Sequence, residues 1–99
     1  MMSMRNGDNY LKLEPKGGIY VREAGKLREE MLAAFEKGQF HFDLDLSGVT
    51  HIDSAGLGVL IQIHKRVEPK GGEVVIRGLS GAVKELFYLT RMDRTFRIE

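Results

Sequence analysis

The chain has 99 residues, of which 42% are hydrophobic and 29% charged, and its formal net charge at pH 7 is +1. This composition is typical of one globular domain and argues against nucleic-acid binding, because the basic residues are spread along the chain and no strong positive field exists. Cysteine is absent, which excludes disulfides and thiolate chemistry and fits a reducing compartment.

No segment of the sequence predicts membrane insertion or export. The apolar runs are shorter than the roughly 18 residues that a membrane span needs. The polar start, residues 1–8, lacks the apolar core of a signal peptide. We therefore expect a cytoplasmic protein with a polar N-terminal tail over residues 1–8 and a single domain over residues 9–99.

The first half of the chain predicts a strand, a helix and a second strand. Residues 10–14 alternate between apolar and polar, and the PKGG sequence that follows is typical of a turn. From about Glu23 the apolar residues recur at helical spacing as far as Gly38, a residue type that commonly ends a helix. Residues 40–46 then alternate strictly and predict a strand.

The second half continues the alternation of strands and helices. A helix is expected from Ser54 to about Glu68, where EPKGG cannot continue it, and EVVIRG predicts a third strand. Ser80 is expected to cap a third helix with Leu86, Phe87 and Leu89 in the core, and residues 95–98 predict a closing strand. This order indicates an α/β domain with parallel neighbours, in a mixed sheet of about four strands with helices packed on it.

The sequence DSAGLG, residues 53–58, places one hydroxyl between a carboxylate and two glycines where a strand is followed by a helix. A nucleophile elbow requires Gly-x-Ser-x-Gly, but Ile52 stands two residues before Ser54, so we do not expect an enzyme. A phosphate-binding loop would need a further glycine or a Gly-Lys-Ser/Thr sequence. The structural interpretation is that Ser54 caps the helix by accepting a hydrogen bond from its first turn.

A helical wheel divides the helix after Ser54 into a broad apolar side and a polar side. The polar side carries Ala55, Gly58, Gln62, Lys65 and Arg66. A glycine inside a helix costs about 1 kcal/mol relative to alanine, so Gly56 and Gly58 require a reason. Two reasons fit the sequence equally well. The glycines let the backbone of another protein approach, or they let the helix pack tightly on its own sheet.

Several histidines and carboxylates invite a metal-binding interpretation. His41, Asp43 and Asp45 share one strand face, but ligands about 6–7 Å apart along a strand do not converge on one ion. We interpret them as a polar sheet face and expect no bound metal. His64 lies among apolar residues of the second helix, and a packed histidine is the better interpretation there.

The segment DLSGVTHIDSAGLGVLI, residues 45–61, closely resembles the signature of the STAS family, in particular its anti-sigma-factor antagonists. The similarity extends over roughly residues 10–98, and DSAGLGV is its most specific part. The resemblance implies that Ser54 is phosphorylated by a partner kinase that is also the anti-sigma factor. It further implies that the unmodified form binds this partner, that phosphorylation releases it, and that a PP2C-type phosphatase reverses the modification.

The resemblance also implies roles for the residues around Ser54. Asp53 shapes the loop and its electrostatics, Gly56 and Gly58 permit close approach, and the exposed docking side is formed by Ala55, Gln62, Lys65 and Arg66. The domain itself takes no cofactor, because ATP and Mg²⁺ are used by the kinase. The alternative is a STAS adaptor of a transporter, sensory or other multiprotein assembly that is not phosphorylated.

Tyr20 and Tyr88 are the remaining surface candidates in the sequence. Each is compatible with a partner contact and with an ordinary surface position. Aromatic side chains are enriched in protein interfaces because they combine a large apolar area with a polar end.

Overall fold

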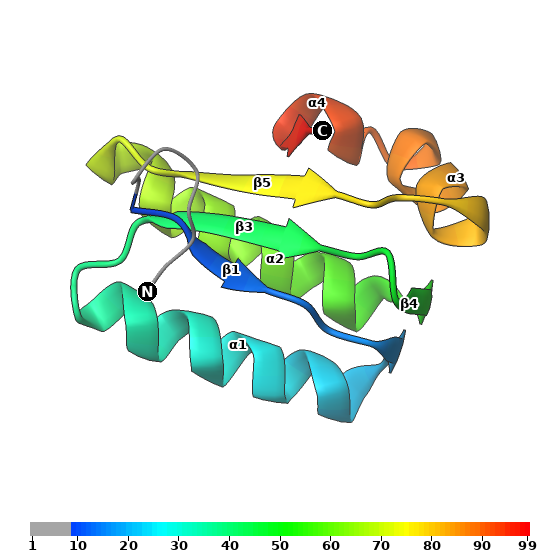
Figure 1. Cartoon of the computed structure of the whole chain (residues 1–99), viewed down its shortest axis with the longest axis horizontal. Coiled ribbons are helices and arrows are strands. Elements are labelled where there is room, and N and C mark those ends of the chain that lie inside the picture. The colour runs from blue at the N-terminus through cyan, green and yellow to red at the C-terminus, as the bar shows by residue number, and fades with distance from the viewer. Residues whose placement is uncertain (1–8) are drawn as a thin grey trace.

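The computed structural model describes residues 9–99, and strands alternate with helices along them (Figure 1). The elements in chain order are β1 (Leu11–Leu13), β2 (Gly17–Ile19), α1 (Val21–Glu36), β3 (His41–Asp45), β4 (Val49–Ile52), α2 (Ser54–Val67), the 3-10 helix η1 (Glu68–Lys70), β5 (Glu73–Arg77), α3 (Gly81–Leu89), α4 (Met92–Thr95) and β6 (Arg97–Ile98). The expected tail, residues 1–8, lies outside the described residues.

The strands form two parallel sheets. β1, β3, β5 and β6 pair in that order in a four-stranded sheet, and β2 pairs with β4 in a two-stranded one. The four strands confirm the expected α/β sheet, and within residues 9–99 the pairings are all parallel, which corrects the expected mixed pairing for this part of the chain. The reason is topological, because at least one helix lies between each strand of the larger sheet and the next, and such crossovers produce parallel neighbours.

The hydrophobic core lies between the larger sheet and the helices α1 and α2. Alternate residues of β3 and β5, such as Leu44 and Ile76, are fully buried on this side. Met31 of α1 and Leu60 of α2 are also fully buried and belong to the same cluster. Helices α1 and α2 therefore cover one face of the sheet, and the opposite face carries mostly polar side chains around the buried Val75.

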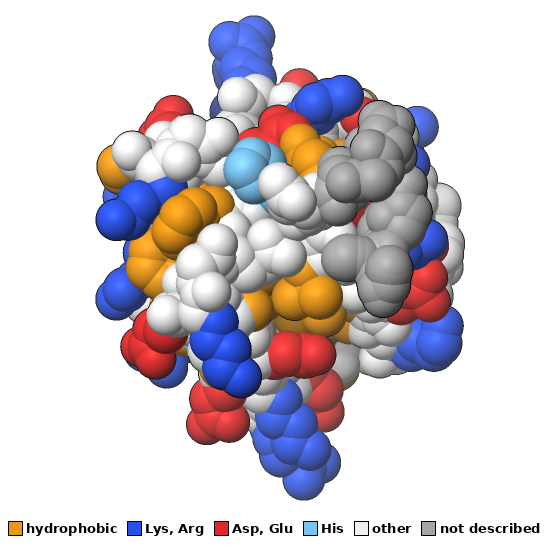
Figure 2. Space-filling view, turned by 60° about the vertical axis from the view of Figure 1, so that its left-hand side comes forward, with side chains coloured by type: hydrophobic (Ala, Val, Ile, Leu, Met, Phe, Trp, Pro, Cys, Tyr) orange, Lys and Arg blue, Asp and Glu red, His pale blue; other side chains and the backbone are white. Residues whose placement is uncertain are grey.

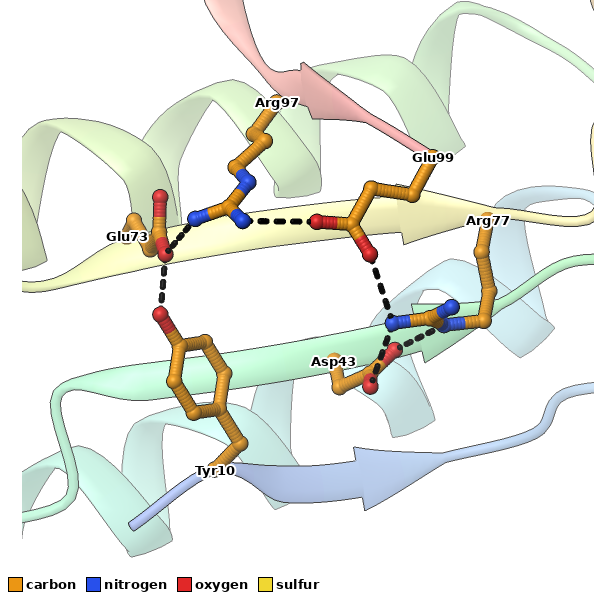
Figure 3. Close-up of polar contacts among 6 residues, drawn as sticks. All are labelled: Tyr10, Asp43, Glu73, Arg77, Arg97 and Glu99. Carbon is orange, nitrogen blue, oxygen red and sulfur yellow. Dashed lines mark hydrogen bonds and ion pairs between the residues drawn. The ribbon is translucent and has the colours of Figure 1, made fainter. Parts of the chain in front are cut away.

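Polar residues on the sheet face opposite α1 and α2 form one continuous network (Figure 3). The Arg77 guanidinium donates to both carboxylate oxygens of Asp43, at 2.9 and 3.1 Å, and to Glu99 at 3.0 Å. Arg97 bridges Glu99 and Glu73, and Tyr10 donates to Glu73. The hydrogen bond to Asp43 raises the pKa of Arg77 above its ordinary value. The network joins all four strands of the sheet, so Asp43 has a structural role.

Short elements account for most differences from the expected secondary structure. The second half of the predicted PKGG turn belongs to β2, which pairs with β4, and Gly17 at φ +78 allows the chain to enter this strand. Helix α1 begins at Val21 rather than near Glu23. The closing strand is reduced to Arg97–Ile98, because the preceding residues form α4.

Helix α3 also differs from its expected packing. Ser80 occupies the N-cap position, but its side chain makes no capping hydrogen bond. Phe87 is buried, as expected, whereas Leu89 is 79% exposed and lies outside the core, because α3 ends at this residue. Leu86 is half-buried at the edge of the core.

The surface carries no dominant charge of one sign. On the face drawn in Figure 2, acidic and basic side chains are interspersed, with apolar patches between them. Within residues 9–99, no helix is both long and apolar enough to cross a membrane, and no three His, Cys, Asp or Glu side chains are grouped to hold a metal ion.

Candidate functional site

The start of α2 is capped by Asp53 and not by Ser54. Asp53 has extended backbone angles, and its Oδ1 accepts hydrogen bonds from the backbone N–H of Ala55 at 2.9 Å and of Gly56 at 3.3 Å. These are two of the donors at a helix N-terminus that have no partner within the helix. The interpretation of Ser54 as the N-cap was therefore wrong by one residue.

Ser54 is the first residue of α2, and its side chain is exposed. Among residues 9–99, its hydroxyl has no hydrogen-bond or ionic partner, because Asp53 already performs the capping. A hydroxyl that does no structural work and faces solvent is accessible to a modifying enzyme. Helix capping, the main structural reason for a serine at this position, therefore does not explain Ser54.

The N-terminus of α1 lies next to that of α2. Strands β2 and β4 are paired in parallel with Ile19 opposite Ile52, and the backbone N–H of Asp53 donates to the Ile19 carbonyl oxygen at 3.3 Å. Each strand is followed directly by its helix. Helix N-termini favour anions, and the first turn of α2 contains no acidic residue. An anion at Ser54 would therefore be tolerated by the fold.

The structure separates the two glycines of the DSAGLG sequence. Gly56 is buried, and a Cβ added there would lie 2.6 Å from Cγ1 of Ile52, so this glycine lets α2 pack on its own strand. Gly58 is exposed, and a Cβ there would meet nothing within 4 Å. Only Gly58 leaves open space for an approaching backbone, so the expectation that Gly56 contacts a partner is contradicted by its burial.

The expected docking side of α2 divides into a near half and a far half. Half-buried Ala55 and exposed Gly58 lie within one helical turn of Ser54. At 1.5 Å per residue, Gln62 is about 12 Å and Arg66 about 18 Å along the axis from Ser54. These distances exceed the screening length of about 8 Å at physiological salt, so charge at Ser54 acts mainly on the near half.

Two residues of the far half have contacts with α1. Gln62 accepts a hydrogen bond from Arg28 at 3.1 Å, and the Arg66 guanidinium lies 5.9 Å from the centre of the Phe35 ring. Lys65 is exposed. The residues predicted from one helical wheel therefore do not form one free surface, since Gln62 and Arg66 help to join the two helices.

The second helix also contains His64, and sequence reasoning placed it correctly. Its ring packs edge-on against Phe96 at 5.5 Å between ring centres, and Nε2 lies 3.7 Å from Glu68. The packed interpretation of His64 is confirmed. It lies in the last turn of α2, away from Ser54.

Sequence reasoning left open Tyr20 and missed Val21 and His51, which lie beside the start of α2. Tyr20 is 47% and Val21 73% exposed, and the Tyr20 and His51 rings stack at 6.3 Å. Spacing does not mark Val21 as exposed, because it stands three residues before the buried Ala24, which is helical spacing.

Comparisons with known proteins identify the family. The STAS domain family model matches residues 1–99. The anti-sigma-B factor antagonist of Bacillus subtilis (strain 168) is 30% identical over 89 residues, which are 90% of this chain and 81% of that protein. A solved protein from Thermotoga maritima is 28% identical with a TM-score of 0.86, covering 92% of this chain and 79% of that one. An anti-sigma factor antagonist from Mycobacterium paratuberculosis is 25% identical with a TM-score of 0.77, covering 95% and 80% respectively. The chain therefore belongs to the STAS domain family.

Proposed function

We propose that this protein is a phosphorylation-controlled anti-sigma-factor antagonist with Ser54 as the phosphate acceptor. The observation that carries the proposal is the exposed Ser54 hydroxyl, which has no partner among residues 9–99 because Asp53 caps α2 in its place. The similarity to the Bacillus subtilis anti-sigma-B factor antagonist supports an anti-sigma factor as the partner. The proposal adds that this partner is also the serine kinase.

The switch follows from charge at one helix terminus. A phosphoserine adds about −1.5 to −2 charges, which changes the formal net charge from +1 to about −1. The N-terminus of α2 stabilises this anion, so the domain stays folded. The same charge repels a partner that docks on Ser54, Ala55 and Gly58. A loss of about 3 kcal/mol in binding free energy weakens the complex more than a hundredfold.

The domain performs no chemistry of its own in this proposal. The kinase supplies ATP and Mg²⁺. The Ser54 Oγ forms a bond to the γ-phosphorus as the bond to the β,γ-bridging oxygen breaks, ADP leaves, and the hydroxyl proton passes to a base of the kinase. A PP2C-type phosphatase hydrolyses the phosphoester and restores the unmodified hydroxyl. The chain acts in the cytoplasm as a protein-binding regulator and holds no cofactor.

The test is phosphorylation of the purified chain by the anti-sigma factor kinases of its source genome, with ATP and Mg²⁺. We expect one phosphate by intact mass and its location on Ser54 by peptide mapping. Ser54→Ala should accept none and should bind the kinase constitutively. Ser80→Ala is the matched control, because Ser80 is also an exposed serine at the start of a helix without a side-chain capping bond.

Each outcome has a defined meaning. Phosphate on Ser54 that weakens kinase binding supports the antagonist. Phosphate on Ser80, or none from any of the kinases, contradicts the proposal. Stable capture of a transporter or sensory protein in the absence of any phosphorylation would assign the chain to the adaptor class instead.

A further inference from the structure

Adjacent Asp53 and Ser54 are both good N-cap residues, so the start of α2 has two possible registers. In the structure Asp53 is the N-cap, and Ser54 is the first residue of the helix. A cap side chain accepts a hydrogen bond from the backbone N–H two or three residues after it. If Ser54 became the cap, its Oγ would accept from Gly56 or Leu57, and α2 would begin one residue later.

Asp53 occupies both of these donors. Its Oδ1 accepts a hydrogen bond from the backbone N–H of Gly56 at 3.3 Å, and its carbonyl oxygen accepts one from the N–H of Leu57 at 3.1 Å. The backbone of Asp53 is extended, and its own N–H donates to the Ile19 carbonyl oxygen at 3.3 Å. Because both donors are already bonded, the exposed Ser54 hydroxyl is left without a partner among residues 9–99.

We propose that Asp53 is a positioning residue for phosphorylation, which acts by fixing the register of α2 and not by its charge. The inference rests on the proposed function of Ser54 and adds how the fold keeps this hydroxyl reactive. In the transfer, a lone pair of the Ser54 Oγ forms the bond to the γ-phosphorus as the β,γ bond of ATP breaks, ADP leaves, and the hydroxyl proton passes to the kinase.

A capping serine uses the same oxygen for a different purpose. Its Oγ accepts a backbone N–H bond, which turns the oxygen toward the helix and engages a lone pair. Without an acceptor at Asp53, Ser54 becomes the cap in most molecules, and its Oγ is withdrawn from the kinase. The carboxylate therefore protects the phosphate acceptor by taking the capping role itself.

The experiment measures kcat/KM for phosphorylation of the full chain by the kinase that modifies the unsubstituted protein. Asp53→Ala should lower kcat/KM about fivefold or more, because only the uncapped fraction of Ser54 reacts. Asp53→Asn keeps a capping oxygen without the charge and should stay within about twofold of the unsubstituted chain. Asp45→Ala is the matched control, because Asp45 also accepts a backbone N–H bond, from Ser47 at 2.9 Å, but in the turn after β3. It should stay within about twofold as well.

A second measurement detects the changed cap without any kinase. Ser54→Ala should hardly shift the urea midpoint when Asp53 is present, because the hydroxyl then has no partner within residues 9–99. In the Asp53→Ala background the same substitution should lower the midpoint, because Ser54 is then the cap. Asp53→Ala alone still loses stability, since a helix that starts one residue later gives up the bond from the Leu57 N–H to the residue 53 carbonyl oxygen.

The remaining outcomes separate this inference from the proposed function. Equal losses of kcat/KM in Asp53→Asn and Asp53→Ala would assign the role of Asp53 to its charge and overturn the inference, while Ser54 remains the acceptor. Rapid phosphorylation of Asp53→Ala, or a Ser54→Ala substitution that is neutral in both backgrounds, also overturns the inference alone. Failure of every kinase to phosphorylate the unsubstituted chain overturns both.

Discussion

The two polar regions of this molecule use their side chains in opposite ways. On the sheet face opposite α1 and α2, Asp43 is buried and paired with Arg77, which in turn reaches Glu99, so that charges of both signs satisfy one another (Figure 3). At the start of α2, the Asp53 carboxylate accepts hydrogen bonds from backbone N–H groups of the helix, and the Ser54 hydroxyl is left without a partner among residues 9–99. The first region stabilises the fold, and the second leaves a reactive group available. A polar residue with no structural work is the better candidate for regulation.

The largest expected effect breaks the sheet network. Arg77→Ala leaves the Asp43 carboxylate, whose side chain is only 5% exposed, without its bidentate partner. Loss of one member of a buried ion pair is strongly destabilising, and we expect the free energy of unfolding to fall by about 3 kcal/mol in urea titrations. Ser54→Ala should change the free energy of unfolding by less than about 0.5 kcal/mol, because the Ser54 hydroxyl has no hydrogen bond within residues 9–99.

A control within the network makes this result specific. Arg97→Ala removes ion pairs to Glu73 and Glu99 from a side chain that is 54% exposed, so it should cost much less than Arg77→Ala. Equal losses from the two arginine variants would show that burial of Asp43 does not set the energy. A large loss from Ser54→Ala would remove the contrast between the two regions.

The next effect separates the two glycines of α2. Gly56→Ala places a Cβ against Ile52 and Ile19, and we expect a loss of about 2 kcal/mol from overpacking. Gly58→Ala meets open space in an exposed helical position and should stabilise the protein by up to about 1 kcal/mol. Thermal and urea unfolding of both variants measure this difference. Destabilisation by Gly58→Ala would contradict the open space above it.

A smaller effect tests the cap at the start of α2. Asp53→Ala removes the acceptor for the backbone N–H groups of Ala55 and Gly56 and should cost about 1 kcal/mol in urea unfolding. Asp53→Asn is the matched control, because asparagine caps a helix about as well as aspartate. If Asp53→Ala were neutral, another side chain would be able to cap α2, and the isolation of Ser54 from the fold would be lost.

The smallest effect is a pH dependence in the turn after β3. Hydrogen bonds from the Ser47 backbone and side chain lower the pKa of Asp45 below its ordinary value of 3.8. The folded-state pKa is therefore below the unfolded one, so this stabilisation is present above about pH 4 and is lost as the pH falls through the folded-state value. Asp45→Asn should reduce stability by less than about 1 kcal/mol at pH 6, and this difference should shrink as the pH falls below 3.8. A difference that does not change as the pH falls would exclude the carboxylate charge as its cause.

Periodicity predicted the long elements well because their packing requires it. The alternation in residues 40–46 and the helical spacing after Ser54 correspond to β3 and α2 in the structure. The elements that were missed, β2 and α4, are three and four residues long. Segments of that length contain little more than one period, too few residues to identify it, and their conformation is decided by the neighbours they pair with or pack on.

The sequence predicted a candidate site at residues 53–58, but the structural roles of these residues could not be assigned from it. Aspartate and serine are equally good N-cap residues, so adjacent Asp53 and Ser54 could not be ranked without backbone angles. Gly56 and Gly58 are chemically identical, and only burial against Ile52 distinguishes them. Gln62 and Arg66 contact residues of α1, and a helical wheel of α2 alone does not show these contacts.

The most direct test of the account is the affinity of one anti-sigma factor kinase for the unmodified chain and for the chain phosphorylated stoichiometrically on Ser54. Calorimetry should give a dissociation constant more than a hundredfold larger for the phosphorylated chain, while circular dichroism shows the same fold in both. Equal dissociation constants for two folded forms would contradict the claim that charge at the start of α2 controls binding.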